Sequence, residues 1–200
     1  MGSGAIPIVL VFLLVLLTWQ TIYSSNRDLV RAKEWGDLAR RALPFGALAL
    51  MALSLFVVQG YREGWVMITW LFACGVLIVL ASVLSISSTE RRANKAFRSG
   101  NFQRAAELYG ELAEEKPLAR HHAYLGAALG ASERYQESVD SSTEAIKKDP
   151  KYGLAYYNRA LVLHRMGKKS RAVKDLKKAQ ETDLPRRFRS AARKMIEDLS

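Results

Sequence analysis

The spacing of hydrophobic positions changes near residue 87. Before it, apolar residues form long runs without charge, at residues 6–23, 43–61 and 65–86. After it, apolar and small residues recur every three or four positions among charged ones, which is the period of an amphipathic helix. The pattern predicts an all-α chain, with a membrane domain in residues 1–87 and a polar helical part in residues 88–200.

The three apolar runs are long enough to cross a bilayer. The shortest has 18 residues, and at about 1.5 Å per residue it nearly spans a hydrocarbon core of about 30 Å. Trp19 and Tyr23 end the first run, and such rings favour the membrane interface. Residues 60–64 allow only a tight turn, which makes the second and third runs antiparallel neighbours. We predict three membrane-spanning helices.

Residues 26–42, between the first two runs, carry an apolar stripe among charged residues. Leu29, Ala32, Trp35 and Ala39 recur at helical intervals, which predicts an amphipathic helix. Its tryptophan and basic excess suit a membrane surface. The alternative is a helix that extends from the first span and packs on its neighbours, and the sequence leaves both open.

Lys and Arg in the loops orient the spans. Residues 24–41 hold five, the turn holds only Arg62, and four follow the third run within residues 91–98. The positive-inside rule therefore predicts the N-terminus outside and residues 88–200 in the cytoplasm.

Residues 89–186 repeat three times at a spacing of 33 or 34 residues, which is typical of a helix-turn-helix solenoid. Small residues in two columns predict that the paired helices cross closely. A glycine that can take positive φ stands at the turn between the helices in the first and third copies, a glutamate stands there in the middle copy, and a proline follows each second helix. The columns are Ala93, Gly126 and Ala160; Ala105, Ser138 and Ala172; Gly100, Glu133 and Gly167; and Pro117, Pro150 and Pro185.

The segment HHAYLGAALGASERYQESVDSSTEAIKKDP, residues 121–150, resembles a tetratricopeptide repeat. Leu125-Gly126, Tyr135 and Ala145 stand at the signature places of that family. Residues 155–183 resemble a second copy and residues 90–117 a first, whereas Ser138 and Ser142 depart from the family pattern. The resemblance covers about half the chain and implies a protein-binding α-solenoid without chemistry of its own.

An amphipathic stripe follows the last proline. Phe188, Ala192, Met195 and Leu199 lie on one helical face, with basic residues opposite. Because a solenoid needs a polar outer helix over its last core surface, residues 187–200 are predicted to form a capping helix.

The resemblance also implies a partner-binding groove, because the first helix of each repeat lines the concave surface in this family. Some members clamp a carboxylate there with lysine and asparagine. Asn94 and Asn158 fit, but Glu90, Tyr124 and Leu154 stand at places where a clamp has lysine or asparagine. The groove residues by register are Glu90, Asn94, Arg120, Ala123, Ala127, Tyr157, Asn158, Leu161 and His164.

The formal net charge is +11, and most of the excess lies late in the chain. Sixteen Lys/Arg and four Asp/Glu lie in residues 147–194, and the basic surface predicted there is Arg171, Lys174, Lys177 and Lys178. Anionic lipid and an acidic protein are its candidate partners. Nucleic acid is disfavoured because no stacking aromatics interleave with the charges. The alternative is a solvated face that keeps the domain soluble.

No motif predicts catalysis, a metal or a cofactor. His121 and His122 point about 100° apart on a helix, and His164 has no Cys, Asp or Glu at ligand spacing. The single cysteine, Cys74, excludes an intramolecular disulfide. We predict a protein that is not an enzyme.

Together these patterns predict a membrane-anchored scaffold whose repeats recruit a protein partner, in the assembly or stabilisation of a membrane protein complex. The layout is similar to that of membrane-tethered repeat proteins that serve photosynthetic and respiratory complexes, which implies a bacterial plasma membrane or a thylakoid-type membrane. The alternative is an integral accessory subunit of such a complex, because one span would have sufficed for anchoring.

Overall fold

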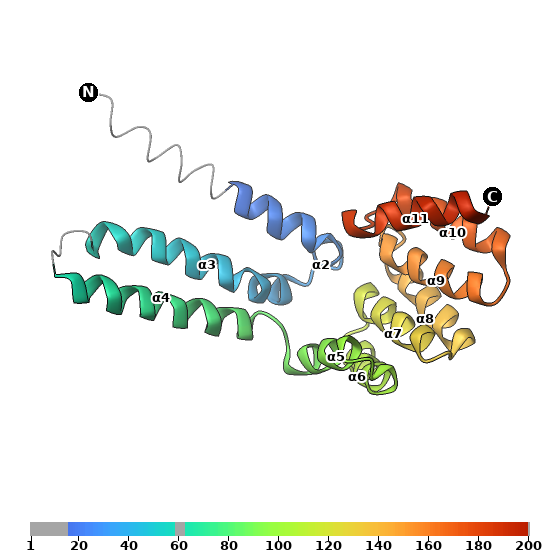
Figure 1. The fold of residues 1–200 in the computed structure, drawn as a ribbon, viewed down its shortest axis with the longest axis horizontal. Coiled ribbons are helices and arrows are strands. Elements are labelled where there is room, and N and C mark those ends of the chain that lie inside the picture. The colour runs from blue at the N-terminus through green and yellow to red at the C-terminus, as the bar shows by residue number, and fades with distance from the viewer. Residues whose placement is uncertain (1–15, 59–62, 200) are drawn as a thin grey trace, which may run out of the picture. The chain divides into compact units, whose positions relative to one another are not determined.

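The computed structural model describes residues 16–58 and 63–199 of the chain. These residues are helices joined by short connections, with no β-strand among them. The chain divides into two compact units, residues 1–87 and residues 88–200 (Figure 1). Each unit is described by itself below.

The described part of the first unit consists of two shorter helical segments followed by two long helices. Residues 16–25 are helical, and α2 (Arg27–Arg31), α3 (Trp35–Val58) and α4 (Gly64–Leu84) follow. α3 and α4 lie side by side (Figure 1). The indole Nε1 of Trp70 on α4 donates a hydrogen bond of 2.9 Å to Oγ of Ser54 on α3.

Most large apolar side chains of the first unit are exposed. Every exposed large hydrophobic residue in the described part of the chain lies between Leu16 and Leu84. Phe72 on α4 is 75% exposed. Among the described residues, α4 is the one helix that is long and apolar enough to cross a membrane. Much of the first predicted span and the end of the second, at residues 1–15 and 59–62, lie outside the described residues.

The prediction of one helix over residues 26–42 is wrong. α2 ends at Arg31, and Lys33 has a φ of 58°. The N–H of Glu34 donates to the carbonyl of Leu29, which is the longer bond of a Schellman cap. α3 then begins at Trp35 and continues through Pro44 into the apolar run. The apolar stripe did not reveal this cap because its left-handed residue is a lysine and not a glycine.

The second unit consists of seven described helices, in which consecutive helices pack against one another. The pairs α5/α6, α7/α8 and α9/α10 follow each other along the chain, and α11 packs on α10 (Figure 1). The bounds are α5 (Ser88–Arg98), α6 (Phe102–Glu115), α7 (Ala119–Ala131), α8 (Tyr135–Lys148), α9 (Gly153–Arg165), α10 (Lys169–Glu181) and α11 (Arg186–Leu199).

Each pair turns through the same backbone arrangement. Gly100, Glu133 and Gly167 have φ values of 78°, 64° and 75°, which confirms the predicted turns. In each case the N–H of the next residue donates to the carbonyl five residues back, as from Asn101 to Ala96. This is again the Schellman arrangement. Glu133 adopts the left-handed conformation at a cost of about 1 kcal/mol, because its Cβ approaches the following carbonyl.

Small residues allow the close crossing of the paired helices, as predicted. Ala160 on α9 and Ala172 on α10 are completely buried. In the middle pair, Oγ of Ser138 donates to the carbonyl of Gly126 at 2.6 Å. A Cβ atom at Gly126 would lie 3.2 Å from the backbone oxygen of Ser138. The backbones therefore pack too closely for a larger residue at that position.

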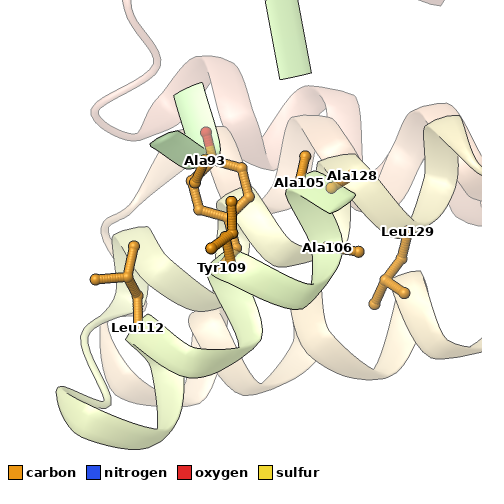
Figure 2. Packing of buried hydrophobic residues seen from close by; sticks show 8 residues of the cluster. Ala93, Ala105, Ala106, Tyr109, Leu112, Ala128 and Leu129 are labelled. Carbon is orange, nitrogen blue, oxygen red and sulfur yellow. The ribbon is translucent and has the colours of Figure 1, made fainter. Parts of the chain in front are cut away.

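The core continues from one pair into the next. Figure 2 shows residues of α5 and α6 packed with Ala128 and Leu129 of α7 in one cluster. At the other end, Ala192 of α11 is completely buried in the cluster that contains α9 and α10. No pair covers its apolar surface alone, so each depends on its neighbours for burial.

Arg159 forms an ion pair within the third helix pair and a hydrogen bond to the second pair. Nε and Nη2 of Arg159 on α9 donate to the carboxylate of Asp175 on α10 at 2.7 and 2.8 Å. Nη1 of Arg159 donates to Oγ1 of Thr143 on α8 at 3.0 Å. Side-chain exposures of 19% for Arg159 and 10% for Asp175 show that the pair is largely shielded from water.

We expect Ala160→Leu to lower the free energy of unfolding of a fragment of residues 88–200 by roughly 1–3 kcal/mol, because the added atoms overpack the crossing. The measurement is chemical denaturation followed by circular dichroism. Gly110→Ala is the control, because Gly110 lies in α6 with open space around its Cβ position. That change should stabilise the fragment by roughly 0.5–1 kcal/mol. An Ala160→Leu variant as stable as the wild type would contradict the close crossing.

Candidate partner-binding groove

A groove of about 690 Å³ lies on the second unit and is lined by residues from several helix pairs. Most of the lining comes from the first helices of the three pairs, which are α5, α7 and α9. The remaining lining residues come from α11 and, with Tyr109, from α6. The lining residues are Asn94, Phe97, Arg98, Tyr109, Tyr124, Ala127, Gly130, Ala131, Leu154, Tyr157, Asn158, Leu161, Val162, His164, Arg165, Arg187, Phe188 and Met195.

The sequence repeat explains why these residues meet. Asn94, Ala127 and Leu161 are equivalent positions in successive copies, and all three line the groove. Equivalent positions on stacked first helices face the same side of a solenoid. A column in the aligned repeats therefore becomes a row of side chains along the groove.

Six of the nine groove residues predicted from the sequence line it. They are Asn94, Ala127, Tyr157, Asn158, Leu161 and His164. The other three, Glu90, Arg120 and Ala123, do not belong to this lining and are 7%, 4% and 0% exposed. Ala123 packs in a cluster with Ala145 and Ala155, so it belongs to the contact between helix pairs. Repeat register alone does not show which positions neighbouring helices cover.

Other lining residues were missed by sequence reasoning. Arg98 and Arg165 each lie four residues after a predicted groove residue, so their helical spacing could have found them. Phe188 and Met195 come from α11, which was expected only to cap the core. Their position depends on the packing of α11, for which the repeat offers no equivalent column.

Aromatic side chains are paired in the groove. The rings of Tyr109 and Tyr124 have centroids 5.5 Å apart, and those of Tyr157 and Phe188 are 5.2 Å apart. The hydroxyl of Tyr109 donates to Oδ1 of Asn94 at 2.9 Å. Burial raises the pKa of both Tyr109 and Tyr157 above the ordinary value, so both phenols are neutral at physiological pH.

The two asparagines that fit the pattern of a carboxylate clamp form hydrogen bonds within the solenoid. Oδ1 of Asn94 accepts from Tyr109, and Nδ2 of Asn158 donates to the carbonyl of Ala123 at 2.9 Å. Asn158 is 7% exposed. Asn158 thus uses within the solenoid the amide donor that a clamp would present to a carboxylate, whereas Asn94 uses its Oδ1 acceptor.

The charged groups of the groove have one sign. Arg98, Arg165 and Arg187 belong to its lining, which includes no Asp or Glu. The guanidinium of Arg187 lies 4.8 Å from the centroid of the Phe188 ring. Cationic groups beside aromatic and aliphatic surface can bind an anionic group and an apolar side chain together.

The predicted basic surface lies outside this groove. Arg171, Lys174, Lys177 and Lys178 are exposed on α10 and do not belong to the lining. Nζ of Lys178 lies 3.1 Å from Oε2 of Glu181. Elsewhere in the described part of the chain, no group of three His, Cys, Asp or Glu side chains is placed to hold a metal ion.

Comparison with known proteins identifies the class to which the second unit is similar. Residues 143–174 match the family model described as Tetratricopeptide repeat. A DnaJ homolog subfamily C member 7 homolog of Dictyostelium discoideum is 31% identical over 111 residues, 53% of this chain and 21% of that protein. The TPR repeat-containing thioredoxin TTL4 of Arabidopsis thaliana is 34% identical over 100 residues, 48% of this chain and 14% of that protein.

A solved structure shows the same fold. The TPR domain of Sgt2 from Aspergillus fumigatus superimposes with a TM-score of 0.50 at 19% identity, over 56% of this chain and 74% of that chain. Residues 143–174 are therefore similar to a tetratricopeptide repeat, and the second unit has an all-α, TPR-like solenoid fold. The matches span about a fifth and about a seventh of the two relatives' lengths.

Proposed function

We propose that the chain is a scaffold whose groove binds an acidic peptide segment of a protein partner. The observation that carries the proposal is a lining with three arginines, several aromatic rings and no carboxylate. A segment with an Asp or Glu beside an aromatic or large aliphatic residue complements both features. The repeat family to which the second unit is similar supports a protein as the ligand.

We propose further that the first unit anchors this scaffold in a membrane through spans at residues 6–23, 43–61 and 65–86. The exposed apolar side chains of α3 and α4 support the proposal, because so many exposed large apolar side chains are unfavourable in water. In this arrangement the N-terminus lies outside and the repeats lie in the cytoplasm. The scaffold would then act in assembling or stabilising a membrane protein complex.

A second candidate function is that of an integral accessory subunit, in which the transmembrane helices make the main contacts. The hydrogen bond between Trp70 and Ser54 favours it. A polar bond between two apolar helices fixes their mutual register, which anchoring alone does not require. Replacing residues 1–87 with an unrelated single-span anchor should abolish incorporation into the complex under this candidate. The same chimera should assemble normally if the repeats alone recruit the partner.

We expect Arg98→Gln combined with Arg165→Gln to weaken binding of an acidic, aromatic-containing peptide to residues 88–200 at least about tenfold, because two charge-assisted contacts are removed. The measurement is fluorescence anisotropy over a peptide set graded in net charge. Arg104→Gln is the control, because Arg104 is exposed on α6 beside Glu107 and does not line the groove. Equal binding of neutral and acidic peptides would contradict the proposal.

The proposed topology makes a separate prediction. A glycosylation acceptor inserted after Arg62 should be modified in microsomes, and one fused after Ser200 should not, because the oligosaccharide is added on the lumenal side. Gel mobility before and after deglycosylation measures the result. Modification at the C-terminal site would reverse the orientation, and extraction of the chain by alkaline carbonate would exclude anchoring by spans.

A further inference from the structure

We propose that the exposed faces of α10 and α11 bind the anionic headgroups of the bilayer that holds the first unit. This inference rests on the membrane anchoring proposed above and does not involve the groove. We call the site the basic face. It consists of Arg171, Lys174 and Lys177 on α10 and Arg186, Arg193 and Lys194 on α11, all of which are exposed.

On α10 the cations lie opposite the buried stripe. Ala172, Leu176 and Ala179 are completely buried. At about 100° per residue, Arg171, Lys174 and Lys177 project from the other side of the helix. The stripe holds α10 in the solenoid and directs these side chains into solvent.

The same division occurs on α11. Ala192 is completely buried, and Phe188 and Met195 pack against the same core. Arg193 and Lys194 lie on the outward side and are exposed. Because α11 packs directly on α10 (Figure 1), the two cationic faces belong to neighbouring helices of the second unit.

The nearby acids leave most of these charges unbalanced. Asp175 is buried against Arg159, and Glu181 pairs with Lys178. In the described residues no acidic side chain forms an ion pair with any member of the basic face. Other exposed cations of the solenoid do have such partners, as Arg134 has in Glu137. Glu197 and Asp198, at the end of α11, are the remaining acids of these two helices.

The composition of the face favours lipid over an acidic protein. No exposed large hydrophobic residue of the described chain lies on the second unit, whereas protein interfaces are anchored by buried aromatic and aliphatic side chains. Long basic side chains without such anchors suit an array of mobile headgroups. Each cation near an anionic leaflet contributes roughly a fivefold gain in binding.

The chain itself supplies the membrane. Only residues 85–87 separate α4 from α5, so a bilayer that contained α4 would be tethered to the solenoid at high effective concentration. Contact of the basic face with this bilayer would limit the orientations of the solenoid and hence of its groove.

The test uses the full chain in nanodiscs of phosphatidylcholine, with or without phosphatidylglycerol. A bimane fluorophore is attached through Ser170→Cys in a Cys74→Ala background, because Ser170 is exposed on α10 and Cys74 is the one native cysteine. Spin-labelled lipid headgroups quench the fluorophore on contact. We expect quenching in anionic nanodiscs, little in neutral ones, and its loss at about 0.5 M salt.

Two variants that remove the same net charge at different places test whether docking depends on the basic face or only on the total charge. Arg171→Gln, Lys174→Gln and Lys177→Gln together should reduce the docking equilibrium about a hundredfold, since three cations are removed. The control triple is Arg104→Gln, Lys147→Gln and Lys148→Gln, which removes the same charge from cations that face Glu107 or Glu144. It should dock like the parent. Circular dichroism verifies that both variants are folded.

Three results would overturn the inference: no quenching in anionic nanodiscs, equal quenching in neutral ones, or equal losses in the two triple variants. Binding of polyglutamate to the basic face without quenching by lipid would indicate an acidic protein instead. Failure of the chain to co-elute with neutral nanodiscs would refute the membrane anchoring itself. Co-elution without quenching refutes only the role of the basic face.

Discussion

The second unit depends on the close approach of the two helices in each pair. Ala160 and Ala172 are completely buried at one crossing, and Gly126 meets Ser138 at another. The short interaxial distance brings successive pairs into register, because the apolar surface left by one pair is covered by the next. The groove follows from this stacking, since it is lined by the first helices of all three pairs together with α11.

The charged residues of the solenoid lie in three different settings, and each setting suits a different interaction. Asp175 on α10 is buried and forms an ion pair with Arg159, which also donates a hydrogen bond to α8. The arginines of the groove share its lining with aromatic residues, a setting that suits an anionic and apolar segment. The cations of the basic face stand without such rings, which suits headgroups. The excess of basic residues can thus support two kinds of binding, because the surfaces around the groove arginines and around the basic face differ.

The two units place their apolar residues differently. In the second unit large apolar residues are covered by neighbouring helices, whereas in the first they remain exposed on α3 and α4. The same hydrophobic effect accounts for both if the first unit has lipid as its solvent. The bond between Trp70 and Ser54 is consistent with helices that associate through specific polar contacts and not through burial alone.

The sequence by itself determined the features that depend on local geometry and repetition. Equivalent columns predicted the crossing residues and the places of the turns, because every repeat packs its two helices in the same way, whereas the positive φ of Glu133 was found only in the structure. Tertiary structure decided what depends on neighbours. The burial of Glu90 and Arg120, the entry of Phe188 into the groove and the helix break at Lys33 arise from contacts or backbone conformations that no single column records. Periodicity indicates which face of a helix is apolar, but only the packed chain shows what covers it.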